Sequence, residues 1–386
     1  MRPRAQRVVI LIGALVAAAL LLPSTLAHAF LERAPTQAAV LAPWDARVAA
    51  AAAADRVAHG ADPRDAKVSR LITAALARDL TVIRAVELRA VALAAAGQEQ
   101  RAAHLFELSS GASRRSLPTR LWLIQKAVDQ GNVGGALANF DIALRTSSDA
   151  PQLLFPILLR AAGDSGLVTP IAAMLDRPSD WRLMFLLRGA SQAPAAHDLA
   201  NVVLHMRDRA PIMEGAVDQK LIERLVTGGD FAQAVRMRDH FGSPKQPLVA
   251  DRTFADGQGR YPFGWGLAER ADLRAERSIA DGRTMLSYRA SSSGGQLAAQ
   301  LLAAPPGRYR LATRSAARTD GGTWVLTCAT RSGVLGLLVL PVDEGGEASA
   351  DVDIPGDCPA QWLTLQIGRA DGPSAGAIAW VDLRRR

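Results

Sequence analysis

Acidic side chains near the C-terminal end are the first candidates for chemistry. Asp343, Glu344 and Glu347 are followed by Asp351 and Asp353. Glycoside hydrolysis needs two carboxyl groups about 5 to 10 Å apart across a cleft. These acids instead fall at an expected turn and on the strand after it, a position typical of solvated residues. Calcium held by these loop acids is the other chemistry that they allow, and no residue pattern supports it.

The histidines and cysteines form no catalytic or metal-binding pattern. The six histidines are dispersed, without the H-x-x-x-H or H-E-x-x-H spacing of metal sites. His197 and His205 are close enough to share a helical face but lack a third ligand. The chain also has no G-x-S-x-G elbow, phosphate-binding glycine loop or C-x-x-C. We therefore expect no catalytic residue, no metal, no cofactor and no enzymatic activity.

Aromatic side chains on short strands are the remaining candidates for ligand contact. From Asp281 onward, apolar and polar residues alternate in segments separated by Gly and Pro, which is typical of half-buried antiparallel strands. The pattern predicts a β-sandwich over residues 248–386. Its expected strands are Arg283–Ala290, Gln296–Leu302, Arg308–Ser315, Thr323–Thr330, Val334–Leu340, Ala348–Ile354, Gln361–Ile367 and Ala377–Leu383.

The alternation also predicts which side chains leave the core. On one strand Trp324 shares a face with Leu326 and Cys328, whereas on another Trp362 lies opposite a face made of Leu363, Leu365 and Ile367. An aromatic ring on the outer face of a sandwich can stack on the apolar face of a pyranose. We therefore single out Trp362, and after it Trp265 and Trp380, as candidate sugar contacts. Packing inside the sandwich is the alternative for each.

Several segments together resemble a known fold. These are Phe254, Pro262–Trp265, Gln296–Gln300, Pro306–Leu311, Trp324–Cys328 and Ala379–Asp382. Their order is similar to that of the jelly-roll, galactose-binding-like fold of carbohydrate-binding modules, over the C-terminal third only. The resemblance implies a fold in which aromatic residues often bind sugar and loop acids often bind calcium. Neither set of ligand contacts matches particular positions in this chain.

The N-terminal segment has the pattern of an export signal. Three arginines precede an uncharged run over residues 8–22, and the small-residue motif Ala27-His28-Ala29 follows. We expect cleavage between Ala29 and Phe30. The alternative is an uncleaved inner-membrane anchor formed by residues 8–22. Both readings place the rest of the chain in the periplasm or outside the cell.

The cysteine count and the charge agree with export. Cys328 and Cys358 are the only cysteines, and we expect them to form a disulfide in an oxidising compartment, with buried free thiols as the alternative. The formal charge of +8 falls to about +5 once residues 1–29, with three arginines and no acids, are removed. The other basic residues are scattered among acids, so we expect no nucleic-acid partner and only a weak preference for anionic ones.

The middle of the chain predicts helices with an internal repeat. Ala46–Ala58, Asp65–Asp79 and Leu80–Ala96 have helical composition or spacing. The trio Gly97, Ala102 and Phe106 recurs 34 residues later as Gly131, Ala136 and Phe140. This period is typical of tetratricopeptide repeats, with a generic α-solenoid as the alternative. The expected pair is Arg120–Gln130 and Val133–Thr146, with a degenerate copy at Gly229–Ala234. Further helices outside the period are expected over Pro151–Ala162, Leu167–Leu175, Trp181–Arg188 and Ala195–Arg209.

A stacked helical array offers a concave face for protein partners. Arg115 and Trp122, with Arg114, Arg120 and Lys126, are candidates to line that face, and a solvated helix side is the alternative. The expected organisation is a signal or anchor (1–29), an alanine-rich lead-in (30–62), a tetratricopeptide-like domain (63–245) and the jelly roll (248–386).

The pairing of these domains resembles envelope proteins associated with bacterial exopolysaccharide export. That resemblance implies a non-catalytic exported protein, with helices that dock on protein partners and a sandwich that faces glycan. Membrane association follows only if the N-terminal segment stays uncleaved. A pure protein scaffold and a polysaccharide-modifying enzyme remain as alternatives, because fold alone does not decide function.

Overall fold

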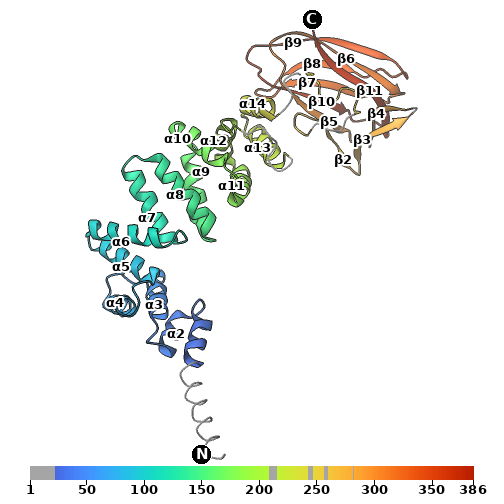
Figure 1. The fold of residues 1–386 in the computed structure, drawn as a ribbon. Helices are drawn as coiled ribbons and strands as arrows, with labels where there is room; N and C mark the ends of the chain where they lie inside the picture. Colours follow the sequence, from blue (N-terminus) through green and yellow to red (C-terminus); the bar gives the residue numbers. More distant parts are fainter. Residues whose placement is uncertain (1–21, 208–214, 242–246, 256–259, 281) are drawn as a thin grey trace, which may run out of the picture. The chain divides into compact units, whose positions relative to one another are not determined.

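A computed structural model describes residues 22–207, 215–241, 247–255, 260–280 and 282–386. Helices occupy the earlier part of the chain and strands the last part (Figure 1). The chain divides into two compact units, Met1–Leu154 and Phe155–Arg386. The expected signal segment lies largely outside the described residues, and Ala29 and Phe30 fall in a helical stretch over 22–30. No helix within the described ranges is long and apolar enough to cross a membrane.

The first unit is helical, and its consecutive helices pack on one another. Helices α3 and α8 match their expected bounds, and α4 and α5 are shorter than expected. Along the chain, α3 packs on α4, α5 on α6 and α7 on α8. The helices are α2 (Pro35–Leu41), α3 (Ala46–Ala58), α4 (Ala66–Arg78), α5 (Ile83–Ala95), α6 (Glu99–Ala112), α7 (Leu117–Asp129), α8 (Val133–Thr146) and α9 (Ala150–Ala161), which crosses into the second unit.

The 34-residue repeat has a structural basis in how the helix pairs turn. Gly97 and Gly131 follow α5 and α7 with φ of +73° and +67°, a left-handed conformation that favours glycine. After α5, the amide of Gln98 donates to the carbonyl of Leu93, which is the Schellman pattern, and the same bond recurs after α7. The repeated phenylalanines, Phe106 and Phe140, are buried in the helices that follow.

The second unit begins with helices that pack through aromatic rings. Phe155 lies edge-on to Phe185 at 5.3 Å between ring centroids, and Trp181 contacts both rings. Gly229 repeats the left-handed turn seen in the first unit, and Phe231 after it is buried. The helices are α10 (Ser165–Leu175), α11 (Asp180–Ser191), α12 (Ala193–Leu204), α13 (Ala216–Thr227) and α14 (Phe231–Phe241).

The described part of the C-terminal region forms two antiparallel sheets. Sheet 1 has the order β1-β5-β10-β7-β8, and sheet 2 has the order β2-β3-β4-β11-β6-β9. The strands are β1 (Gly266–Leu267), β2 (Glu269–Arg270), β3 (Leu273–Ala280), β4 (Arg283–Ala290), β5 (Gly295–Leu302), β6 (Gly307–Ala317), β7 (Thr323–Cys328), β8 (Val334–Val339), β9 (Glu347–Ile354), β10 (Gln361–Ile367) and β11 (Ser374–Arg385). The predicted fold class, helices followed by an antiparallel sandwich, is therefore confirmed.

Strand β3 was not expected from the sequence. It pairs with β4 along its whole length, yet only Leu273 and Ala275 are buried. Charged residues and the 75 % exposed Ile279 fill the rest, so the apolar alternation that marks a strand is too short to detect.

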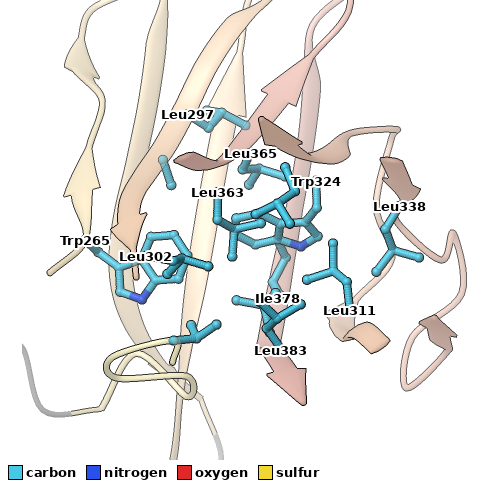
Figure 2. Packing of buried hydrophobic residues seen from close by; sticks show 14 of the residues in the cluster. Trp265, Leu297, Leu302, Leu311, Trp324, Leu338, Leu363, Leu365, Ile378 and Leu383 are labelled. Atoms are coloured by element: carbon cyan, nitrogen blue, oxygen red, sulfur yellow. The ribbon is translucent and has the colours of Figure 1, made fainter. Parts of the chain in front are cut away.

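The core between the sheets has Trp324 at its centre (Figure 2). Its side chain is fully buried, and its Nε1 donates to Thr313 Oγ1 on β6 at 3.2 Å. Leu363, Leu365 and Ile367 of β10 belong to this core, and Trp362 does not. The predicted assignment of faces on both strands is therefore confirmed.

The predicted disulfide is also confirmed. Cys328 and Cys358 are bonded, with 5.7 Å between their Cα atoms and a sequence separation of 30. Cys328 ends β7 and lies opposite Gln361 in the ladder, so the bond ties β7 to the segment that leads into β10. Closing a loop of this size stabilises the fold by about 3 kcal/mol.

The buried phenol of Tyr288 links sheet 2 to the turn before β7. Tyr288 on β4 is 2 % exposed and its hydroxyl donates to the carbonyl of Gly321 at 2.6 Å. Gly376 leaves room for that hydroxyl, because a Cβ there would lie 2.5 Å from the Tyr288 oxygen. Burial raises the pKa of Tyr288 well above its ordinary value, and the charge of Asp320 raises it further.

This pKa predicts a specific alkaline sensitivity. As pH rises past about 10, the unfolded phenol ionises while the folded one stays protonated, so its contribution to stability is lost. We expect Tyr288→Phe to cost about 1 kcal/mol at neutral pH through the lost hydrogen bond. The variant should then lose less stability than wild type when unfolding free energies are measured by urea denaturation at rising pH. Parallel pH profiles for the two proteins would contradict the assignment.

Candidate functional site

A stacked aromatic pair with one exposed member lies on the outer face of sheet 1. The ring of Tyr261 stacks on that of Trp362, with 5.9 Å between centroids and 24° between planes. Tyr261 is 46 % exposed, whereas Trp362 on β10 is half-buried. Gly266 on β1 makes this arrangement possible, because a Cβ there would lie 2.6 Å from the Tyr261 ring. Tyr261 is thus the solvent-facing member of the pair.

Helices α13 and α14 pack on the same outer face of sheet 1, beside the aromatic pair. Phe231 at the start of α14 packs with Leu301 and Ala360, and Trp362 and Phe263 pack against this cluster. The guanidinium of Arg238 lies 4.8 Å from the centre of the Phe263 ring. Trp362 is therefore partly a packing residue, against helix α14 and not inside the sandwich, and its ring is not a free platform.

Polar groups surround the aromatic pair. Gln219 of α13 donates from Nε2 to the main-chain carbonyl of Tyr261 and to Glu223 Oε1, the latter at 2.7 Å. Burial, and then the charge of Glu223, raise the pKa of Tyr261, so its hydroxyl is protonated at neutral pH. Thr327 lies opposite Trp362 in the ladder and is partly exposed. These groups can form hydrogen bonds with the hydroxyls of a ligand.

The other candidate tryptophans lie elsewhere. Trp265 is 6 % exposed, sits 5.5 Å from Trp324 between ring centroids, and donates from Nε1 to the Asp251 carbonyl at 3.2 Å. The hypothesis that Trp265 stacks on sugar is therefore corrected, because core packing leaves its ring no open face. Trp380 is half-buried on β11 of sheet 2, away from the Tyr261 pair in the strand order.

The candidate residues of the helical unit are only partly at the surface. Trp122 stacks on Phe106 at 4.9 Å, and Lys126 lies 5.0 Å over its ring while pairing with Glu107. Arg120 is 4 % exposed and donates to Asn139 Oδ1, so the expectation that it lines a surface is wrong. Arg115 is exposed and borders a groove.

Two apolar grooves flank helix α5. The groove of about 540 Å³ beside Arg115 has mainly α3, α5 and the start of α7 as walls. The other, of about 690 Å³, is bordered by the exposed Leu80 and Leu108. Glu87 lines the first groove and is 6 % exposed; its Oε1 accepts from Ser109 Oγ at 2.8 Å and Thr119 Oγ1 at 3.1 Å. This buried carboxylate thereby joins α5, α6 and α7.

The sequence singled out neither Tyr261 nor Glu87. The helix that carries Glu87 is rich in alanine, and its polar partners come from two later helices. Tyr261 precedes the expected strands, and its ring partner lies far along the chain. A usable signal for Tyr261 was the Gly266 that follows it, which marks a close approach by another group.

The acidic stretch and the histidines do not converge on a site. Asp351 pairs with Arg310 at 3.4 Å and Arg386 at 2.8 Å on the exposed surface. His197 instead hydrogen-bonds Asp230, the residue before α14. Across the described residues, no three His, Cys, Asp or Glu side chains lie close enough together to hold a metal ion.

Comparisons with known proteins give low similarity. No family model and no curated protein matches the chain. Among solved structures, TmCBM61 in complex with beta-1,4-galactotriose has 13% identity and a TM-score of 0.26, covering 37% of this chain and 100% of the module. The enzymatically active domain of Bacteriophage CBA120 tailspike protein 4 has 12% identity and a TM-score of 0.26, covering 37% and 22% respectively. A carbohydrate binding module from Cellvibrio mixtus lichenase 5A, in complex with cellotriose, has 15% identity and a TM-score of 0.20, covering 31% and 92%. These values assign this chain neither a ligand nor an activity.

The Glu87 network makes a prediction about stability. Glu87→Ala removes the acceptor of two buried hydroxyls and leaves a cavity, so we expect a loss of about 2 kcal/mol in unfolding free energy. Glu87→Gln keeps the shape and one acceptor oxygen and should lose less. Urea denaturation of the full chain, followed by helical circular dichroism, measures both values. Equal stability of Glu87→Ala and wild type would show that the network does not hold these helices together.

Proposed function

We propose that this protein is a non-catalytic binding protein of the bacterial cell envelope that holds a glycan on its sandwich and a protein partner on its helices. The observation that carries the glycan proposal is the exposed Tyr261 ring stacked on Trp362, with polar groups at its edge. Supporting export are the arginine-led apolar N-terminal run and a disulfide in the sandwich.

The chemistry of the aromatic pair suits a sugar ring. The C–H face of a pyranose is apolar and gains stability on an aromatic surface, while its hydroxyls need hydrogen-bond partners around the ring. Tyr261 supplies the surface, and Gln219, Glu223 and Thr327 supply nearby amide, carboxylate and hydroxyl groups. Trp362 holds the Tyr261 ring from behind, which reduces the entropy lost when a ligand binds.

Removal of the exposed ring tests this proposal. Tyr261→Ala should weaken binding of the full chain to its polysaccharide at least about tenfold, because stacking contributes roughly 1.4 kcal/mol or more. Tyr261→Phe keeps the ring and should keep most of the affinity. Isothermal titration against neutral, amino and uronic-acid polysaccharides provides the measurement.

Trp380→Ala is the matched control, because Trp380 is a half-buried tryptophan on the other sheet. It should bind as wild type does. Absence of saturable binding to every polysaccharide, or equal affinity of Tyr261→Ala and wild type, would refute glycan binding at this place.

The helical unit supports the second half of the proposal. The repeated left-handed glycine turns, with a buried phenylalanine in each following helix, suit a tetratricopeptide-like array. The apolar groove bordered by Leu80 and Leu108 has the size and character of a site for a few apolar side chains of a partner. A place in exopolysaccharide export would use both parts, with the helices on an export component and the sandwich on the polymer.

A charge placed in the groove tests partner binding. Leu108→Lys should abolish crosslinked co-purification of an envelope protein. Burial of the lysine charge in an apolar contact costs free energy that no ion pair or hydrogen bond offsets. Val128→Lys introduces the same charge at an equally exposed apolar residue of α7 and should leave recovery unchanged. If neither variant changes the recovered proteins, this groove is not the docking site.

A further inference from the structure

One strand edge of the sandwich is unusually apolar. Strand β8 ends sheet 1 and, among the described strands, hydrogen-bonds to β7 alone. Its outer-face side chains Val334, Leu337 and Val339 are 57 %, 56 % and 66 % exposed, while Leu338 between them faces the core at 5 %. Val342 just beyond the strand is 52 % exposed. Strand β9 of sheet 2 lies beside β8, but no described strand hydrogen-bonds to the outer edge of β8. The edge thus has unpaired strand positions beside a row of exposed valine and leucine.

The other sheet ends differ from β8 in ways that prevent strand pairing. In the described part of the sandwich, β1 and β2 are only two residues long, and the β3 edge that β2 leaves unpaired carries Glu276 and Arg277. Strand β9 is long but carries Glu347, Asp351 and Asp353. Short length and charge are the usual protections of an edge against pairing with another chain. The segment Val334–Val339 has neither protection, since it contains no charge and no proline.

We propose that β8 pairs antiparallel with β8 of a second copy of this chain, joining two copies of sheet 1 into one continuous sheet. A two-fold axis at Leu337 places this residue opposite its counterpart and puts both apolar rows on the same face. The open main-chain groups then bond to each other, and the exposed valines and leucines of the two strands cover one another.

The charges at the two ends of β8 favour this partner and this direction. Arg331 precedes the strand, whereas Asp343 and Glu344 follow it, and all three are exposed. The register that sets Leu337 opposite itself also sets Arg331 near Asp343 of the second copy. Within its own chain Arg331 pairs with Asp357 at 2.8 Å, so it remains held at the surface near this end. A parallel pairing would instead bring like charges together.

The pairing has a consequence for recognition, although it does not depend on glycan binding. Tyr261 lies on the same outer face of sheet 1 and contacts β1, at the opposite end of the strand order from β8, and β10 in the middle of it. A joined sheet would carry two such aromatic pairs facing the same side. A polymer that reaches both would be held more tightly than by either alone.

Sedimentation velocity of the full chain tests self-association. Since a single strand-edge contact is small, wild type should pass from monomer to dimer across about 1 to 200 µM. Leu337→Lys, which sets two lysines against each other, should weaken the dimer at least about tenfold. Ile279→Lys, at the 75 % exposed apolar residue of β3 in the other sheet, should dimerise as wild type does.

A charge exchange tests the register and the direction of pairing. Arg331→Glu and Asp343→Arg should each weaken the dimer, and the double variant should recover it. Near-ultraviolet circular dichroism confirms that each variant keeps the sandwich packing. A wild type that stays monomeric throughout, a dimer unaffected by Leu337→Lys, or equal effects of Leu337→Lys and Ile279→Lys would overturn the proposal. Failure of the double variant to recover would overturn the antiparallel register.

Discussion

Burial of Trp324 between the two sheets is the constraint on which the sandwich depends. Because strand side chains alternate, an indole directed into the core commits its neighbours on β7 to the outer face. Residues that lie opposite each other on paired strands point to the same face. Trp362 of β10, opposite Thr327, and Leu337 of β8, opposite Val325, therefore also point to the outer face. A core contact thus decides which side chains meet solvent on sheet 1. The aromatic pair and the apolar edge are both consequences of the same alternation.

The helical unit is organised by a different local rule. A glycine in the left-handed region ends one helix, two main-chain hydrogen bonds close the turn, and an alanine and a phenylalanine of the next helix fill the contact behind it. The buried Glu87 then links three helices through hydroxyl donors, which is a specific interaction inside a set of apolar ones. The turns set the spacing of the array, and the polar network fixes how its members fit together.

Much of this fold could be predicted from the sequence because its signals are local. The bounds of α3, α8, β4 and β10 follow from composition, repeat and alternation, and the disulfide follows from the count of cysteines. The predictions failed for residues whose contact partners come from distant segments of the chain. Trp265 was a candidate for ligand contact because its position before the expected strands does not indicate that Trp324 and Phe254 pack against it. Arg120 was expected at the surface because helical spacing could not reveal Asn139 as its partner.

Trp362 has neighbours in two layers of the second unit. Tyr261 rests on its ring, and the cluster around Phe231 of α14 packs against it. The Trp362 ring therefore contributes both to the ordering of Tyr261 and to the packing of α14 on sheet 1. By thermodynamic linkage, any free energy by which seating the helix favours the ordered tyrosine is equal to that by which the ordered tyrosine favours seating of the helix.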